Sequence, residues 1–210
     1  MGGRRSGGAA RGRVLAAAEV LFGERGYRGV TLGDVAGTLG MRKPSIYHHA
    51  PGGKEQLYAE VMEELLERYR AGMEEAMAHA NPGIREQLKA ATRSLLSQKP
   101  PVSLEGMVLR DMPAISEERS RRLMDVAYRA LHGPLLAALA SARDRGEVRL
   151  PEDPPLISGM ILSLVGGVQI SAYAAGSQHR GTDEGAVADA LVDVLLDGLR
   201  PRAPGEEGGA

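Results

Sequence analysis

The stretch TLGDVAGTLGMRKPSIYHHA, residues 31–50, holds the signals that decide the local fold. Thr31 can cap a helix with its hydroxyl, and Asp34 follows three residues later in a capping-box arrangement. Gly40 stands where that helix must stop and the backbone needs a positive φ, which glycine adopts without steric penalty. Pro44 can open the next helix because its missing N–H would be unpaired in the first turn. The stretch therefore predicts two short helices joined by a tight turn, the helix-turn-helix spacing.

The second of these helices, from about Pro44 to His49, is expected to carry a functional surface. Its outward side chains can all donate hydrogen bonds and none is acidic: Lys43, Ser45, Tyr47, His48 and His49. A phosphate-lined major groove requires such a surface. A metal pair at His48 and His49 is disfavoured, because adjacent helical residues point about 100° apart.

The rest of the chain has helical apolar periodicity, and no strand pattern or internal repeat interrupts it. Aromatic residues make up only 3% of the chain and there is no Cys, so the core must be aliphatic and every Cys-based site is excluded. We expect an all-α protein of about nine helices, with a three-helix N-terminal helix-turn-helix domain and a C-terminal helical bundle for ligand binding and dimerisation. The expected parts are a disordered basic arm (1–10), a DNA-binding domain (11–53), a ligand-binding and dimerisation domain (54–200) and a disordered tail (201–210).

Charge is distributed unevenly along the sequence. Residues 1–55 carry nine Lys or Arg against four Asp or Glu, whereas the remainder carries 17 against 23. A basic end on an acidic body suggests that this end meets a polyanion. The arginines in and next to the arm (Arg4, Arg5, Arg11 and Arg13) are open to two interpretations, contact with DNA or simple solvation. The uncharged stretch Ile157–Gly176 has the length of a membrane span, but its serines, glycines and Gln169 favour a helix buried against protein.

Four segments of the N-terminal quarter resemble the DNA-binding domain of TetR-family (tetracycline-repressor-like) regulators. They are RVLAAAEVLFGERGY (13–27), TLGDVAGTLG (31–40), KPSIYHH (43–49) and KEQL (54–57). The resemblance implies a symmetric dimer in which the last two long helices form a four-helix bundle and the middle helices enclose a small-molecule pocket. The family usually has an aromatic residue after the Tyr-x-His run, whereas this chain has Ala50.

Carried over by position, the resemblance implies which residues contact DNA. Thr31 is expected to touch a phosphate, Tyr47 and His49 to bond phosphates, and Lys54 to anchor the backbone at the start of the next helix. Base edges or thymine methyls are expected to face Lys43, Pro44 and Ser45. The full predicted DNA-binding set is Thr31, Arg42, Lys43, Pro44, Ser45, Tyr47, His48, His49 and Lys54.

The body offers candidate residues for the effector and for the dimer. Methionines fit irregular ligands, so an adaptable apolar pocket is expected, with ordinary core filling as the alternative for each residue. The pocket candidates are Met73, Met107, Met112, Met124, Tyr128, His132, Met160 and Tyr173, with His132 the best polar contact. The predicted dimer interface comprises Gly166, Gly167, Val187, Ala190, Leu191, Val194 and Leu195.

These features together predict a cytoplasmic, ligand-responsive transcription regulator that needs no cofactor or metal. It is expected to be a repressor that binds a palindromic double-stranded operator as a homodimer and is released by a small apolar or amphipathic effector. No membrane partner is expected. An activator, or a helical carrier or adaptor with a degenerate DNA-binding domain, remains an alternative. An enzyme is disfavoured, because the glycines of GERGYRG (23–29) end a helix rather than follow a strand.

Overall fold

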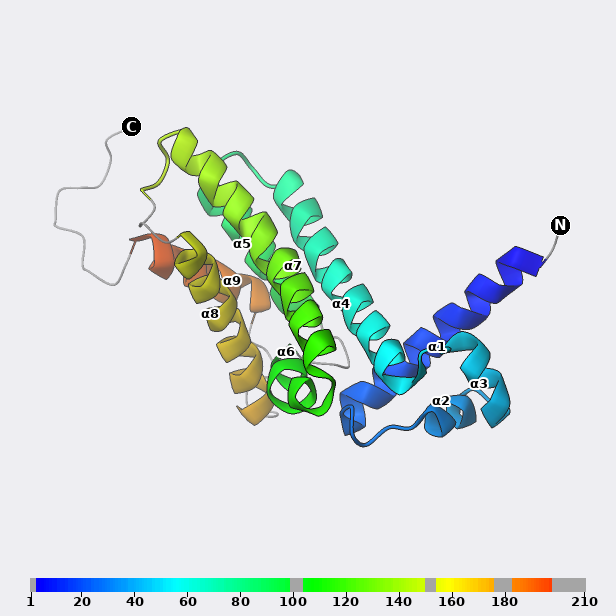
Figure 1. Ribbon diagram of the computed structural model, residues 1–210. Coiled ribbons are helices and arrows are strands. Elements are labelled where there is room, and N and C mark those ends of the chain that lie inside the picture. Colours follow the sequence, from blue (N-terminus) through cyan, green and yellow to red (C-terminus); the bar gives the residue numbers. More distant parts are fainter. Residues whose placement is uncertain (1–2, 99–103, 150–153, 176–182, 198–210) are drawn as a thin grey trace, which may run out of the picture. The chain divides into compact units, whose positions relative to one another are not determined.

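The computed structural model describes residues 3–98, 104–149, 154–175 and 183–197 (Figure 1). Over these residues the chain forms nine α-helices and no strand, which confirms the predicted all-α fold. The chain divides into two compact units. The first comprises residues 1–71 and 98–133, and the second comprises residues 72–97 and 134–210. The first unit thus joins the segment expected to bind DNA with part of the expected body.

Three helices open the first unit: α1 (Gly3–Arg25), α2 (Leu32–Thr38) and α3 (Lys43–His49). Thr31 caps α2, and its hydroxyl and the Asp34 carboxylate form the predicted capping box. Gly40 has a φ of 64°, so the turn between α2 and α3 uses the conformation expected of it. Apolar side chains of all three helices are fully buried between them, among them Ala18, Phe22, Val35 and Ile46.

The expectation of a disordered arm over residues 1–10 is wrong for residues 3–10, which belong to α1. The Gly- and Arg-rich composition suggested an arm, but arginine and the pair Ala9-Ala10 favour a helix. A helix that starts inside α1 propagates at little cost per residue, so it can continue backward through these positions. The expected tail, residues 201–210, lies outside the described residues.

The remainder of the first unit contains the start of α4 (Gly53–Ala78) and an irregular segment that precedes α7 (Glu117–Asp144). In this segment, α6 (Leu104–Gly106) leads into a π-helical turn, η1 (Met107–Asp111), and a 3-10 turn, η2 (Met112–Ala114). The helix α7 continues through Pro134. One boundary between the two units falls between Gly133 and Pro134, inside α7.

The second unit packs α5 (Ile84–Ser97), α8 (Pro154–Ala175) and α9 (Glu184–Asp197) together with the ends of α4 and α7. The amide of Ile84 donates to the Glu147 carboxylate at 2.8 Å, which satisfies a free N–H at the start of α5. Buried side chains line one side of α8, and the opposite side is exposed. Among the described residues, no helix is long and apolar enough to cross a membrane.

Candidate nucleic-acid interface

The helix α3 is anchored on one side and open on the other. Ile46 is fully buried, whereas the Tyr47 side chain is 59% exposed. Lys43, Pro44 and His48 are also exposed, and Ser45 and His49 are half-buried. Most of the side chains expected to face a base or a phosphate are therefore accessible on α3, and no acidic residue lies within the helix.

The start of α3 lies close to the start of α2. A Cβ atom at Gly33 would lie 3.1 Å from Cε of Lys43, so the absence of a side chain there lets the lysine stem lie against α2. Asp34, in the first turn of α2, is the acidic residue near Lys43. Hydrogen bonds from Thr31 lower the pKa of its carboxyl, and the charges of Arg25 and Lys43 lower it further. At neutral pH, Asp34 is an anion beside cations.

Two residues of the predicted DNA-binding set are already engaged within the chain. The Thr31 hydroxyl donates to the Asp34 carboxylate at 2.7 Å. The Lys54 ammonium donates to the Tyr27 carbonyl at 3.0 Å and lies 4.2 Å from the centre of the Tyr27 ring. These bonds give Thr31 and Lys54 structural roles within the first unit. The exposed side chains of Lys43 and Tyr47 are better placed to meet a new partner.

Arg11 anchors the far end of α3. Its guanidinium donates to the carbonyl of His49 and forms an ion pair with Glu60 of α4. A cation at a helix C-terminus satisfies a free carbonyl and favours the helix dipole. The sequence suggested DNA contact or solvation for the arm arginines, and neither interpretation included this bond. Ala50 is buried at the end of α3, so an aromatic side chain is not needed to close the core there.

A buried carboxylate ties the irregular segment η1 to the end of α1 and to α4. The Asp111 side chain is 1% exposed and accepts from the Tyr27 amide at 3.0 Å and from the Tyr58 hydroxyl at 3.1 Å. Arg110 donates to it through Nε at 2.9 Å and to the Phe22 carbonyl at 3.2 Å. Burial, followed by the charge of Asp111, raises the pKa of Tyr58. We call these residues the Asp111 cluster: Tyr27, Tyr58, Arg110 and Asp111.

The predicted effector residues differ in burial. Met73, Met107 and Met112 are buried, and His132 is half-buried and stacks on Tyr128 at 4.5 Å between ring centres. Burial lowers the pKa of His132. Three expected pocket residues lie on the surface instead: Met124, Tyr128 and Met160. The side chain of Tyr173 lies outside the described residues. A hollow in the second unit contains none of these candidates and is lined by Ala76, His79, Ala80, Asn81, Glu86, Ala90 and Arg93.

The predicted dimer residues lie on two neighbouring helices, α8 and α9, and differ in exposure. On α9, Ala188 and Val192 are buried, whereas Ala190 and Val194 are exposed. Val187, Leu191 and Leu195 are half-buried, and so is Gly166 of α8. The exposed side of α8 carries Leu156, Met160, Leu164 and Gly167. Met160, expected in the pocket, therefore shares a face with Gly167.

Comparisons with known proteins agree on the family. The model of the bacterial regulatory proteins of the tetR family matches residues 14–61. The HTH-type transcriptional regulator LmrA of Bacillus subtilis (strain 168) is 30% identical over 175 residues, which cover 81% of this chain and 90% of LmrA. The structure is similar to that of the TetR-family regulator PfmR from Thermus thermophilus, with a TM-score of 0.66, 26% identity and coverage of 90% of this chain and 100% of PfmR. The regulator FadR from Bacillus subtilis, solved with stearoyl-CoA, has a TM-score of 0.72, 17% identity and coverage of 90% and 98%. The chain belongs to the TetR family of DNA-binding transcription regulators.

Proposed function

We propose that the protein is a homodimeric repressor whose two α3 helices enter successive major grooves of a palindromic operator. The observation that carries this proposal is the open face of α3, where Lys43, Tyr47 and His48 stand exposed around the buried anchor Ile46. A two-fold dimer presents the same helix twice, so its half-sites lie about 34–36 Å apart, one turn of DNA.

The second copy is proposed to bind the apolar face of α8 and α9. Leu156, Met160 and Leu164 follow one another at four-residue steps on α8, and Val194 is exposed on α9, which packs against α8. Exposed apolar side chains gathered on adjacent helices typically mark an interaction surface. A two-fold operator requires a two-fold protein, and such an interface uses the same patch on both copies.

The proposed effector is a small apolar or amphipathic molecule, and an acyl thioester is the class that we favour. The flexible, buried side chains of Met107 and Met112 in the first unit suit an apolar chain of variable shape. The similar fold of FadR, which was solved with stearoyl-CoA, supports that class. The effector releases DNA by favouring a conformation whose two α3 helices do not match the groove spacing.

Selection of duplexes from a random library tests the proposal without knowledge of the operator. The expected product is an inverted repeat with half-sites one turn apart. On that operator, Lys43→Ala is expected to cost about 1–3 kcal/mol and to relax base preference, because lysine reads base edges. Tyr47→Ala weakens binding to all sequences alike. Tyr47→Phe, which keeps the ring and removes the hydroxyl, distinguishes the contribution of the hydroxyl to binding from that of the ring.

The salt dependence of binding separates this proposal from a carrier with a degenerate DNA-binding domain. A regulator that displaces counterions loses affinity steeply as salt rises. The proposed function is contradicted if no duplex is enriched, or if the affinity for an enriched duplex does not change with salt. Thermal shift with stearoyl-CoA and with free coenzyme A then tests whether an acyl thioester is the effector class.

A further inference from the structure

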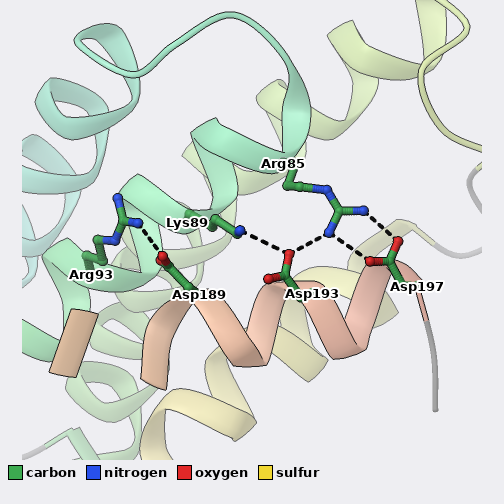
Figure 2. A network of polar contacts seen from close by, with 6 residues as sticks. All are labelled: Arg85, Lys89, Arg93, Asp189, Asp193 and Asp197. Atoms are coloured by element: carbon green, nitrogen blue, oxygen red, sulfur yellow. Dashed lines mark hydrogen bonds and ion pairs between the residues drawn. The ribbon is translucent and has the colours of Figure 1, made fainter. Parts of the chain in front are cut away.

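Six charged residues join α5 and α9 in a regular ladder (Figure 2). The helix α5 supplies only cations and α9 only anions, each at steps of four residues. Arg85 donates to Asp193 at 2.5 Å and to Asp197 at 2.5 Å, and Lys89 lies 3.0 Å from Asp193. Arg93 pairs with Asp189. We call this set the α5–α9 ladder: Arg85, Lys89, Arg93, Asp189, Asp193 and Asp197.

All six charges of the ladder are paired in one antiparallel register only. The cation nearest the start of α5 pairs near the end of α9, and the order reverses step by step toward Arg93 and Asp189. If α9 slid by one helical turn, about 5.4 Å, one cation and one carboxylate would lose their partners. If it slid by a single residue, the carboxylates would rotate by about 100° and leave α5 altogether.

The apolar contacts of α9 do not supply the same selectivity. Its fully buried side chains are Ala188 and Val192, and Leu191 and Leu195 are only half-buried, so the apolar contacts distinguish one turn from the next less sharply than the ion pairs do. Lys89 is only 13% exposed, but its partner Asp193 is 42% exposed, and Arg85 and Arg93 are also open to solvent. Open ion pairs add little net stability, but like charges brought together are costly, so such pairs act mainly on specificity.

We propose that the α5–α9 ladder locks α9 in register and rotation on α5 and thereby sets which face α9 offers to a second copy. Val187, Ala190 and Val194 lie on the side of α9 turned away from Ala188 and Val192, and a rotated α9 would present aspartates there instead. The part of this inference that concerns the second copy rests on the proposed homodimer. The register of α9 on α5 is a property of one chain and does not depend on the homodimer.

Charge reversal of the Arg93–Asp189 pair tests whether the ladder fixes the register of α9 on α5. The variants are Arg93→Asp, Asp189→Arg and the double swap, which restores opposite charges in exchanged positions. The matched control is Arg121→Glu, because Arg121 forms an exposed ion pair within α7 alone. Circular dichroism of each variant establishes that the helices remain formed.

Spin labels report register because the chain contains no cysteine, so introduced thiols are the only ones. Labels at Ser97→Cys on α5 and Ala186→Cys on α9, diluted with unlabelled protein, report the distance within one chain. Each single reversal is expected to shift or broaden that distance, and the double swap to restore it. A sharp, unchanged distance in both reversals, or no recovery in the double swap, overturns the lock.

A single label at Ala186→Cys, an exposed position outside the proposed apolar face, together with sedimentation, reports the second copy. Each reversal is expected to raise the dimer dissociation constant about tenfold or more, and the double swap to reverse this. If the distance within the chain changes while the dimer is unaffected, the link to the interface is wrong. If the unmodified chain shows no second copy at all, the proposed homodimer fails while the lock is judged by the labels on α5 and α9.

Discussion

Replacement of Asp111 by asparagine is the perturbation whose effect follows most directly from the structure. The carboxylate is 1% exposed and accepts from the Tyr27 amide, the Tyr58 hydroxyl and Arg110. An asparagine keeps the shape, but one acceptor oxygen becomes an NH₂ group that faces donors. The change therefore isolates the acceptor chemistry of the Asp111 cluster from its packing.

The expected loss can be worked from the donors that are left without a partner. Each unsatisfied buried donor costs about 1–3 kcal/mol, and asparagine leaves either the Tyr27 N–H or the Tyr58 O–H without its acceptor. Arg110 is roughly half exposed, so water replaces much of its interaction and it adds little. We expect Asp111→Asn to lower the free energy of unfolding by about 1–3 kcal/mol and Asp111→Ala, which unpairs both donors, by about 2–6 kcal/mol.

Urea denaturation followed by circular dichroism measures the loss, and Tyr58→Phe completes a double-mutant cycle with Asp111→Asn. Residues that share a hydrogen bond show coupling of about 0.5–3 kcal/mol. Asp125→Asn, an exposed position on α7, is the control and should change stability by less than about 0.5 kcal/mol.

The same variant has a predicted signature in DNA binding. Because Asp111 holds the end of α1 rather than a phosphate, Asp111→Asn should weaken operator binding without altering the slope of affinity against salt. Additive effects of Asp111→Asn and Tyr58→Phe, or a changed salt slope, would refute the reasoning.

Three further predictions follow from the described contacts. Hydrogen bonds from Ser116 lower the pKa of Glu55, so the free energy that Glu55 contributes is complete above its ordinary pKa of 4.5 and is lost as the pH falls through the lowered value. The melting temperatures of the wild type and Glu55→Gln should therefore differ at pH 7 and converge as the pH falls through the lowered pKa, and a constant difference would count against the bond. Gly40→Ala should lower the free energy of unfolding by about 1–2 kcal/mol, because φ at Gly40 is 64° and the space around it is open, so the cost is that of the backbone alone. Gly37→Ala, inside α2, should raise it by about 0.5–1 kcal/mol. Changes of the same sign in urea denaturation would contradict this assignment. Met160→Lys should convert the dimer to monomer in sedimentation with little change in unfolding, since the side chain is 43% exposed in the single chain, and a persistent dimer would move the interface elsewhere.

The parts of the fold that local chemistry determines were predictable. Thr31, Gly40 and Pro44 each act within a few residues of their own position, and the structure has the cap, the turn and the helix start that they indicate. The apolar period of α9 was less informative, because only Ala190 and Val194 of its five predicted interface residues are exposed.

The contacts that depend on distant residues were not predictable in the same way. Tyr27 and Asp111 are 84 positions apart, and no neighbouring residue marks Asp111 as buried. Exposed and buried methionines have the same helical spacing, so Met160 could not be told from Met73 by pattern alone. The α5–α9 ladder is different, because cations on one helix and aspartates on another at four-residue steps are visible in the sequence and signal an ion-pair seam.

Placement of α3 in the major groove is the central claim, and cleavage of DNA from a reagent tethered to α3 tests it most directly. Since the chain has no cysteine, Ser45→Cys carrying an iron chelate places the reagent at a single position. The account predicts cuts confined to two half-sites one helical turn apart on the selected operator, and none from the same reagent at the exposed position Ala137→Cys on α7. Cuts that are absent, scattered along the duplex or equally strong from position 137 would contradict it.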